Sequence, residues 1–175
     1  PTWIALVVSL RHLAIEHPGY TSSKTITQGR KECWETGSAV VGEIATRYWT
    51  DYAVTSSRHP YIIYFYELLG LSPHTAESLC AKARDALKQF SCLPGLAGLS
   101  PHAPYTVHPA VLECAIDLSA SHFAPLAMHL AESREELELL RDRSGPFVAL
   151  LQSLNAWYPD SLIFKRPIEY LRQLA

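Results

Sequence analysis

Short apolar runs alternate with helix-spaced apolar positions along most of the chain. Four such runs, rich in β-branched, aromatic or continuously apolar residues, predict strands at 39–45, 61–67, 95–100 and 124–130. The nearly continuous apolar run at 39–45 is typical of a strand that is buried on both faces. Around the four runs, apolar side chains recur every three or four residues and predict helices at 3–15, 22–36, 74–91, 108–122, 133–143, 146–157 and 167–174. Strands that alternate with helices are typical of a parallel sheet with right-handed crossovers.

This element order predicts an α/β fold and leaves two architectures open. One is an open, doubly wound sheet, and the other is part of a (β/α)8 TIM barrel. A full barrel needs about 250 residues, whereas this chain has 175. We therefore expect one incomplete barrel domain over 1–175, with a helical lead-in at 1–36, four βα units at 37–132 and a helical extension at 133–175.

Composition narrows the class of protein. Hydrophobic residues make up 48% of the chain and charged residues 18%, which is typical of a folded domain. The net charge is −2 without a basic stripe, so we expect no nucleic-acid partner. The apolar segment 4–10 is too short to cross a membrane and has no basic leader. The four cysteines show no CxxC spacing, and we expect buried free thiols in a reducing, cytoplasmic compartment.

Two short stretches about 25 residues apart carry the candidate chemistry. Residues 98–107 read Gly-Leu-Ser-Pro-His-Ala-Pro-Tyr-Thr-Val, and residues 128–133 read Met-His-Leu-Ala-Glu-Ser. Each is a predicted strand end that opens into a polar loop at a histidine. Because α/β barrels place their chemistry at the carboxyl ends of successive strands, we expect His102 and His129 to share one rim and face a common hollow.

Each of these residues also has a purely structural interpretation. His102 lies between Pro101 and Pro104, which stiffen its loop, but it could be an incidental turn residue. His129 ends an apolar strand, where a neutral imidazole can ligate a metal or simply fill the core. Glu132 can act in proton transfer or supply a charge at a helix N-terminus. Periodicity alone does not choose between these interpretations.

No short metal-binding, nucleotide-binding or hydrolase motif identifies the function of this sequence. The sequence has no HxH, HExxH or Cys/His knuckle, so it carries no complete zinc motif. It also lacks GxGxxG, GxxxxGK[ST] and GxSxG. We expect surface or capping roles for the other six histidines, which fall near predicted helix ends or in loops: His12, His17, His59, His74, His108 and His122.

Together, the two histidine stretches resemble the amidohydrolase superfamily, in particular its metal-dependent deaminases and chlorohydrolases. Two further stretches are similar to the glycine-led second strand and to the third strand of that family. They are Glu-Thr-Gly-Ser-Ala-Val-Val-Gly-Glu at 35–43 and Phe-Tyr-Glu-Leu-Leu-Gly at 65–70. The resemblance covers about residues 30 to 135, and the two histidine motifs are its specific part.

The resemblance implies a role for each matching residue. His129 matches the fifth-strand histidine that ligates the metal, and Glu132 matches the acid that protonates the substrate ring and relays a proton from water. His102 matches the fourth-strand histidine that touches substrate, and Glu67 at the third-strand end takes a supporting role in substrate binding. The implied enzyme uses one divalent metal, zinc or iron, to hydrolyse a C–N bond of a heterocyclic or nucleoside-like small molecule.

The departures from the family pattern are equally informative. The first-strand HxH pair, the sixth-strand histidine and the eighth-strand aspartate have no match, so the four predicted strands correspond to strands 2–5. We interpret the chain as an internal portion of a metal-dependent hydrolase that alone retains little metal or activity. Because half a barrel exposes two strand edges, we expect self-association or a complementary barrel segment as partner. The alternatives are a non-catalytic remnant or subunit and an unrelated doubly wound binding domain.

Overall fold

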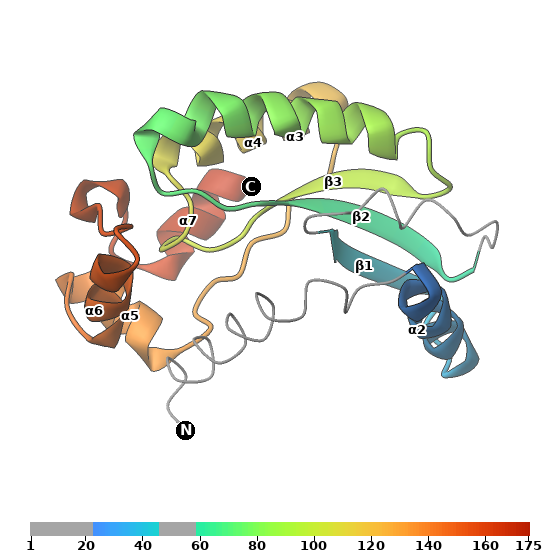
Figure 1. The fold of residues 1–175 in the computed structure, drawn as a ribbon, viewed down its shortest axis with the longest axis horizontal. Coiled ribbons are helices and arrows are strands. Elements are labelled where there is room, and N and C mark those ends of the chain that lie inside the picture. Colours follow the sequence, from blue (N-terminus) through green and yellow to red (C-terminus); the bar gives the residue numbers. More distant parts are fainter. Residues whose placement is uncertain (1–22, 46–58) are drawn as a thin grey trace.

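The computed structural model describes residues 23–45 and 59–175. Within these ranges, a three-stranded parallel sheet in the order β1-β2-β3 forms the centre of the fold (Figure 1). The strands are β1 (Val40–Ala45), β2 (Tyr61–Leu68) and β3 (Leu96–Pro101). The predicted helix at 3–15 lies outside the described residues.

The helices follow the predicted order closely. Helix α2 precedes β1, α3 joins β2 to β3, α4 follows β3, and α5, α6 and α7 form the C-terminal extension. Their bounds, with the short 3-10 turns η2 and η3, are α2 Ser23–Glu35, η2 Pro73–Thr75, α3 Ala76–Phe90, α4 Pro109–His122, α5 Arg134–Asp142, α6 Pro146–Ser153, η3 Pro159–Ser161 and α7 Pro167–Leu174. In the described part of the chain, no helix combines the length and apolar character that a bilayer crossing requires.

Helices cover one face of this sheet. The rings of Tyr64 and Tyr66 lie 5.5 and 6.3 Å from the ring of Phe90 on α3, which places alternate β2 side chains against the helices. Ile26 of α2 packs against the same cluster. A larger core, which includes Leu99 of β3 and Val111 of α4, continues along this face into the C-terminal helices.

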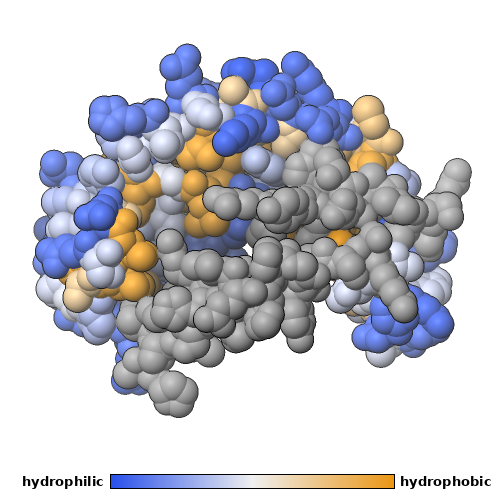
Figure 2. Space-filling model, in the orientation of Figure 1, coloured by the Kyte–Doolittle hydropathy of each residue, from blue (hydrophilic) through white to orange (hydrophobic). Residues whose placement is uncertain are grey.

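The opposite face of the sheet carries the remaining β2 side chains, and Phe65 lies at its centre. A Cβ added at Gly42 would lie 3.3 Å from the Phe65 ring, and one added at Gly98 would lie 2.8 Å from it. The two glycines therefore leave room for this ring across all three strands. Val40, Tyr61 and Leu96 on the same face are 57%, 46% and 40% exposed. In the same orientation, Figure 2 shows a mostly hydrophilic rim around apolar residues gathered toward the middle of the view.

Three expectations need correction. The predicted fourth strand at 124–130 forms one parallel bridge, Leu99 to Leu126, instead of a ladder, because Pro125 has no N–H to donate and β3 is its one described neighbour strand. The predicted burial of 39–45 on both faces is wrong, since in this segment only Ala45 is buried. Helix α6 ends at Ser153 rather than near 157. The chain leaves the helix because Asn155, two residues later, adopts a left-handed conformation (φ 51°).

Candidate active site

The predicted site residues follow the carboxyl ends of neighbouring parallel segments. Glu67 is near the end of β2, and His102 comes directly after β3. The segment 124–130 runs beside β3 through backbone hydrogen bonds from Leu99 N to Pro125 O and from Ala127 N to Leu99 O, both 3.0 Å. A third bond, 2.8 Å from His129 N to His102 O, then joins the two histidine loops directly.

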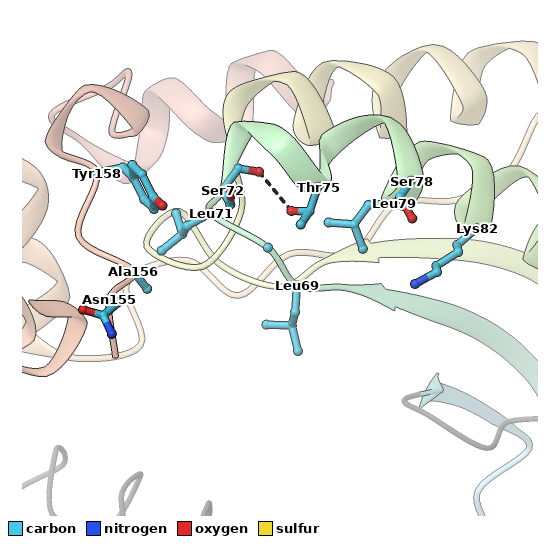
Figure 3. Close-up of a pocket in the computed structure, with 11 residues that line it drawn as sticks. Leu69, Leu71, Ser72, Thr75, Ser78, Leu79, Lys82, Asn155, Ala156 and Tyr158 are labelled. Carbon is cyan, nitrogen blue, oxygen red and sulfur yellow. Dashed lines mark hydrogen bonds between the residues drawn. The ribbon is translucent and has the colours of Figure 1, made fainter. Parts of the chain in front are cut away.

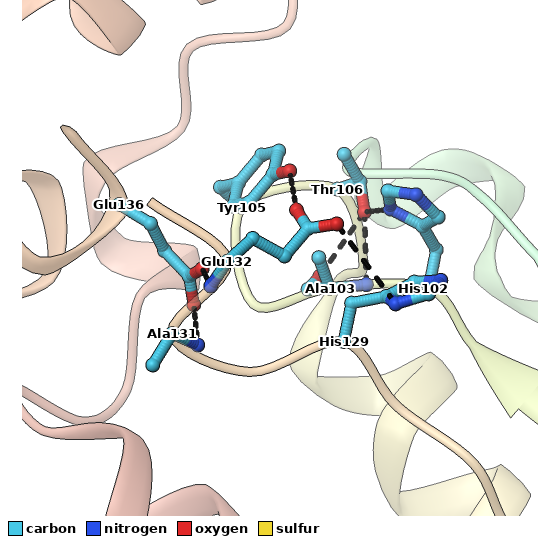
Figure 4. Close-up of polar contacts among 8 residues, drawn as sticks. All are labelled: His102, Ala103, Tyr105, Thr106, His129, Ala131, Glu132 and Glu136. Carbon is cyan, nitrogen blue, oxygen red and sulfur yellow. Dashed lines mark hydrogen bonds and ion pairs between the residues drawn. The ribbon is translucent and has the colours of Figure 1, made fainter. Parts of the chain in front are cut away.

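The side chains converge as the sequence predicts (Figure 4). The rings of His102 and His129 lie 5.2 Å apart between centroids, in an edge-to-face arrangement. His129 Nδ1 lies 3.9 Å from Glu132 Oε1, and the two side chains are 46% and 20% exposed. Glu67 is close enough for the charge of His129 to influence its carboxyl group. The two imidazoles and both carboxylates therefore occupy one end of the sheet.

Thr106 fixes the His102 ring. Its hydroxyl oxygen lies 2.8 Å from His102 Nδ1 and also accepts from the Ala103 N–H at 3.2 Å. This bond uses Nδ1, so Nε2 is the nitrogen left to face a ligand. Burial lowers the pKa of the His102 imidazole below its ordinary value of 6.5, and the positive charge of His129 lowers it further. The structure therefore favours a neutral His102 at physiological pH.

Tyr105 holds the carboxylate of Glu132. Its phenol donates a 2.5 Å hydrogen bond to Oε2, while its ring packs 4.4 Å from the ring of Phe147 on α6. Burial, and then the bond to Glu132, raises the pKa of the Tyr105 phenol above its ordinary value of 10. Tyr105 is thus a permanent donor, and it leaves Oε1 as the Glu132 oxygen that faces His129.

Glu136 fixes the backbone that carries Glu132. Its fully buried carboxylate accepts from Ala131 N at 3.0 Å and from Glu132 N at 2.7 Å. Ala131 has a left-handed φ of 58°, an unfavourable conformation for a residue with a Cβ. The side chain of Ser133, the N-cap of α5, completes the arrangement by accepting from Glu136 N at 3.1 Å. Burial raises the pKa of Glu136, while the two backbone N–H groups lower it.

Glu67 is half-buried near the end of β2, in register with Ser100 of β3. Burial raises the pKa of its carboxyl group, and the charge of His129 opposes that shift. No hydrogen bond to Glu67 is among the contacts described for this site. Its position fits the supporting role that the sequence predicts and assigns it no chemical step.

The other described histidines lie elsewhere. The Nδ1 of His108 accepts from Ala110 N at 3.2 Å and caps α4, which confirms a predicted capping role. His59 stacks 4.5 Å from the ring of Trp34. Over residues 23–45 and 59–175, no group of three or more His, Cys, Asp or Glu side chains is arranged to hold a metal ion. His12 and His17 lie outside the described residues.

Two cavities of the described structure lie away from this cluster. One of about 410 Å³ is formed by the loop after β2, the first turns of α3 and residues 155–158 (Figure 3). Another, of about 240 Å³, lies between α2 and the first two strands. Neither is lined by His102, His129 or Glu132. The candidate site is therefore separate from both of these cavities.

Sequence reasoning missed two residues of this site. It assigned no role in the site to Tyr105 or to Glu136. A Ser followed three residues later by Glu is the pattern of a capping box, which places a glutamate beside the backbone before the helix. That signal could have identified Glu136, whereas the bond from Tyr105 to Glu132 spans 27 residues and has no local signal.

Comparison with known proteins gives a consistent family. No family model matches the chain. It is 37% identical over 101 residues to an aminodeoxyfutalosine deaminase of Deinococcus radiodurans, which covers 56% of this chain and 24% of that protein. It is 30% identical over 104 residues to a 5-methylthioadenosine/S-adenosylhomocysteine deaminase of Desulforudis audaxviator, covering 58% and 23%.

Solved structures agree. The aminofutalosine deaminase of Helicobacter pylori superposes with a TM-score of 0.67 at 27% identity, covering 82% of this chain and 36% of that one. The chain is thus a partial match to these deaminases, in line with the resemblance to the amidohydrolase superfamily that its histidine motifs carry. An adenosine deaminase from Xanthomonas campestris with bound zinc shares the fold, with a TM-score of 0.60 at 21% identity and coverage of 86% and 37%. These neighbours confirm the partial-barrel interpretation over a doubly wound sheet.

The match covers only part of each relative. The chain spans about a quarter of the length of the two curated relatives above and just over a third of the two solved structures. This partial coverage agrees with the observed sheet, because three strands and one bridged segment make up only part of a closed barrel.

Replacing Glu136 tests whether its carboxylate fixes the backbone at Ala131 and Glu132. In E136Q, an amide NH2 faces one of the two N–H groups, so a buried bond is lost and the free energy of unfolding should fall by about 1–3 kcal/mol. E135Q is the matched control, because it removes a neighbouring first-turn charge and should cost no more than about 1 kcal/mol. Urea denaturation measures both. Equal losses in the two variants, with unchanged amide exchange at residues 131 and 132, would contradict this role.

The His102 ring should titrate at a pH below 6.5 in the folded chain and near 6.5 in the urea-unfolded chain. Folding depresses this pKa, so the unfolded state binds the proton first as the pH falls. This group therefore lowers the free energy of unfolding as the pH drops through 6.5, until the folded ring is also protonated. NMR of the imidazole resonances measures it, and a folded midpoint at or above the unfolded one would refute the expectation.

Proposed function

We propose that this chain supplies part of the active site of a hydrolytic deaminase that acts on nucleoside-like amines. One observation carries the proposal: His102, His129 and Glu132 converge at the carboxyl end of the sheet, with 5.2 Å between the rings and 3.9 Å between His129 and Glu132. The deaminase names of the sequence relatives support the reaction class. The proposal treats residues 1–175 as one incomplete barrel domain in the cytoplasm.

Glu132 is the proton carrier in this proposal. Deamination replaces the C–NH2 of an sp² carbon by C=O, using water and releasing ammonia. A carboxylate beside the reacting carbon can take one proton from the attacking water and deliver it to a ring nitrogen. It can then take the proton of the new hydroxyl group and deliver it to the leaving amine, which departs as ammonia while the C=O bond forms. Because Tyr105 already donates to Oε2, Oε1 is the oxygen assigned to this transfer.

His102 and Glu67 would bind the substrate. A neutral His102, held at Nδ1 by Thr106, can present Nε2 to a polar group of a heterocycle in a fixed direction. Glu67 lies near the end of the adjacent strand and faces the same side of the sheet as Phe65. Its role in this proposal is a second contact to the substrate.

A divalent metal, zinc or iron, would require more than the described residues provide. His129 is the proposed ligand, but a stable site needs three or four ligands, and no such group exists over the described ranges. The residues therefore do not fit a metal by themselves, and we assign no step to one. We expect the isolated chain to lose added zinc on dialysis, and retention of one equivalent would refute this.

We further propose that the remaining strands of a barrel, in a longer or partner chain, cover the open face of the sheet. The apolar side chains on that face include Val40, Ile63 and Leu96, and two of them are at least 40% exposed. The chain matches only 23% to 37% of the length of the four relatives named above, so most of the homologous structure lies outside the match. The non-catalytic alternative, a remnant or accessory subunit, uses the same face.

A chimera tests the catalytic proposal. The 101-residue matched segment of the Deinococcus radiodurans enzyme is replaced by that of this chain, and ammonia release from the host enzyme's substrate is measured. We expect activity that falls at least about 100-fold in E132Q, because proton transfer is lost. E135Q in the same chimera should retain its activity.

Circular dichroism and metal analysis keep this test interpretable. A folded, metal-loaded chimera that releases no ammonia would contradict the catalytic proposal and favour the remnant. An active chimera in which E132Q is as fast as E135Q would retain the deaminase assignment but refute the role of Glu132.

The isolated chain should associate with itself through the open sheet face. We expect light scattering to give a mass above that of one 19.5 kDa chain. I63K adds a charge to the open face and should shift the chain toward the monomer, whereas A81K, at an exposed position of α3, should not. A stable wild-type monomer, or equal effects of the two variants, would contradict this interface.

A further inference from the structure

We propose that Cys80 and Cys114 form an intrachain disulfide when the chain meets a hydroperoxide, linking α3 to α4 reversibly. The inference is independent of the proposed function. The sequence predicted four buried free thiols. All four are free, but the expected burial is wrong, since Cys92 is exposed and Cys33, Cys80 and Cys114 are only partly buried.

The fold brings the two cysteines to corresponding positions on neighbouring helices. Helices α3 and α4 follow adjacent parallel strands and pack against each other. Helix α4 lies behind α3 in Figure 1. Cys80 is the fifth residue of α3 and Cys114 the sixth of α4, so each lies in the second turn of its helix.

Both cysteines also lie on inward stripes of their helices. Cys80 lies four residues after Ala76 and three before Ala83, both of which are buried. Cys114 lies three residues after Val111 and four before Leu118, which are buried on α4. Its side chain packs against the core cluster that these helices share. Helical periodicity thus turns each thiol toward the neighbouring helix.

The two thiols lie close together. Cys80 is near enough to the Cys114 thiol to interact with it, and Arg84 and Asp117 also act on Cys114 electrostatically. Burial, and then the contact with Cys80, raises the pKa of the Cys114 thiol. The first attack on an oxidant is assigned to Cys80, because Arg84 lies one helical turn after it on α3.

The chemistry needs one hydroperoxide per disulfide. The Cys80 thiolate attacks a peroxide oxygen, the O–O bond breaks, and Cys80 becomes a sulfenic acid while hydroxide leaves. The Cys114 sulfur then attacks the Cys80 sulfur, the S–O bond breaks, and the Cys114 proton leaves with the hydroxyl group as water. Two thiols are oxidised and one peroxide is reduced to water, and a dithiol reductant reverses the change.

Cys33 and Cys92 serve as internal references. Cys33 is on α2, and Cys92 follows α3, where its exposed thiol donates to the Lys88 carbonyl at 3.6 Å. If accessibility alone governed oxidation, Cys92 would react before the partly buried pair. If the Cys80–Cys114 contact governs it, the pair should react first and within one chain.

Peptide mapping of the reduced chain after treatment with hydrogen peroxide decides between these outcomes. Free thiols are alkylated, and peptides are analysed without reduction. We expect a Cys80–Cys114 linked peptide that forms at least about tenfold faster than Cys92 is oxidised, that is removed by dithiothreitol, and that comes from monomer-mass material on a denaturing gel.

Single variants sharpen the result. C114S should abolish the linked peptide and leave a Cys80 sulfenic acid that dimedone traps, whereas C92S should form the link as the wild type does. The mapping of the wild-type chain needs no variant to fold. Two results would overturn the proposal. One is oxidation of Cys92 while Cys80 and Cys114 are both recovered as alkylated, and therefore unoxidised, thiols. The other is a disulfide between any other pair of cysteines.

Discussion

The backbone hydrogen bond from the His129 amide to the His102 carbonyl is the contact on which the candidate site depends. Two loops that are separate in sequence can present a common site only if their strands pair in parallel and in one register. The segment before His129 meets β3 through a single bridge and a few backbone bonds. Its exact placement therefore depends on these few bonds rather than on a long ladder, and every distance within the cluster follows from them.

A second constraint is the asymmetry of the sheet. Side chains of β2 alternate between a helix-covered face, with Tyr64 against Phe90, and an opposite face centred on Phe65. In a closed barrel, the latter face is the interior, and the site residues lie at its rim. In the proposed function, the open face and the missing metal ligands have the same origin, because both would be supplied by strands that the match does not include.

Much of the fold could be predicted from periodicity, because the helices carry strong apolar stripes and β2 is rich in aromatic and β-branched residues. The pairing of each segment with neighbouring strands was harder to predict. The segment 124–130 resembles a strand in composition, yet a strand is defined by its neighbours, and here Pro125 and the limited pairing prevent a ladder. For the same reason, the burial of 39–45 was overestimated: an apolar run indicates the environment that a strand requires, not whether both of its faces are covered.

Within the site, the sequence predicted the histidines and Glu132 but not the groups that orient them. Tyr105 and Glu136 act on Glu132 through a long-range side-chain bond and through the backbone, respectively. Both contacts bury polar groups, and the hydrogen bonds offset that desolvation. The fold itself therefore orients the carboxylate. In the proposed function, this orientation suits a proton carrier, because a proton transfer requires a carboxylate held in one direction.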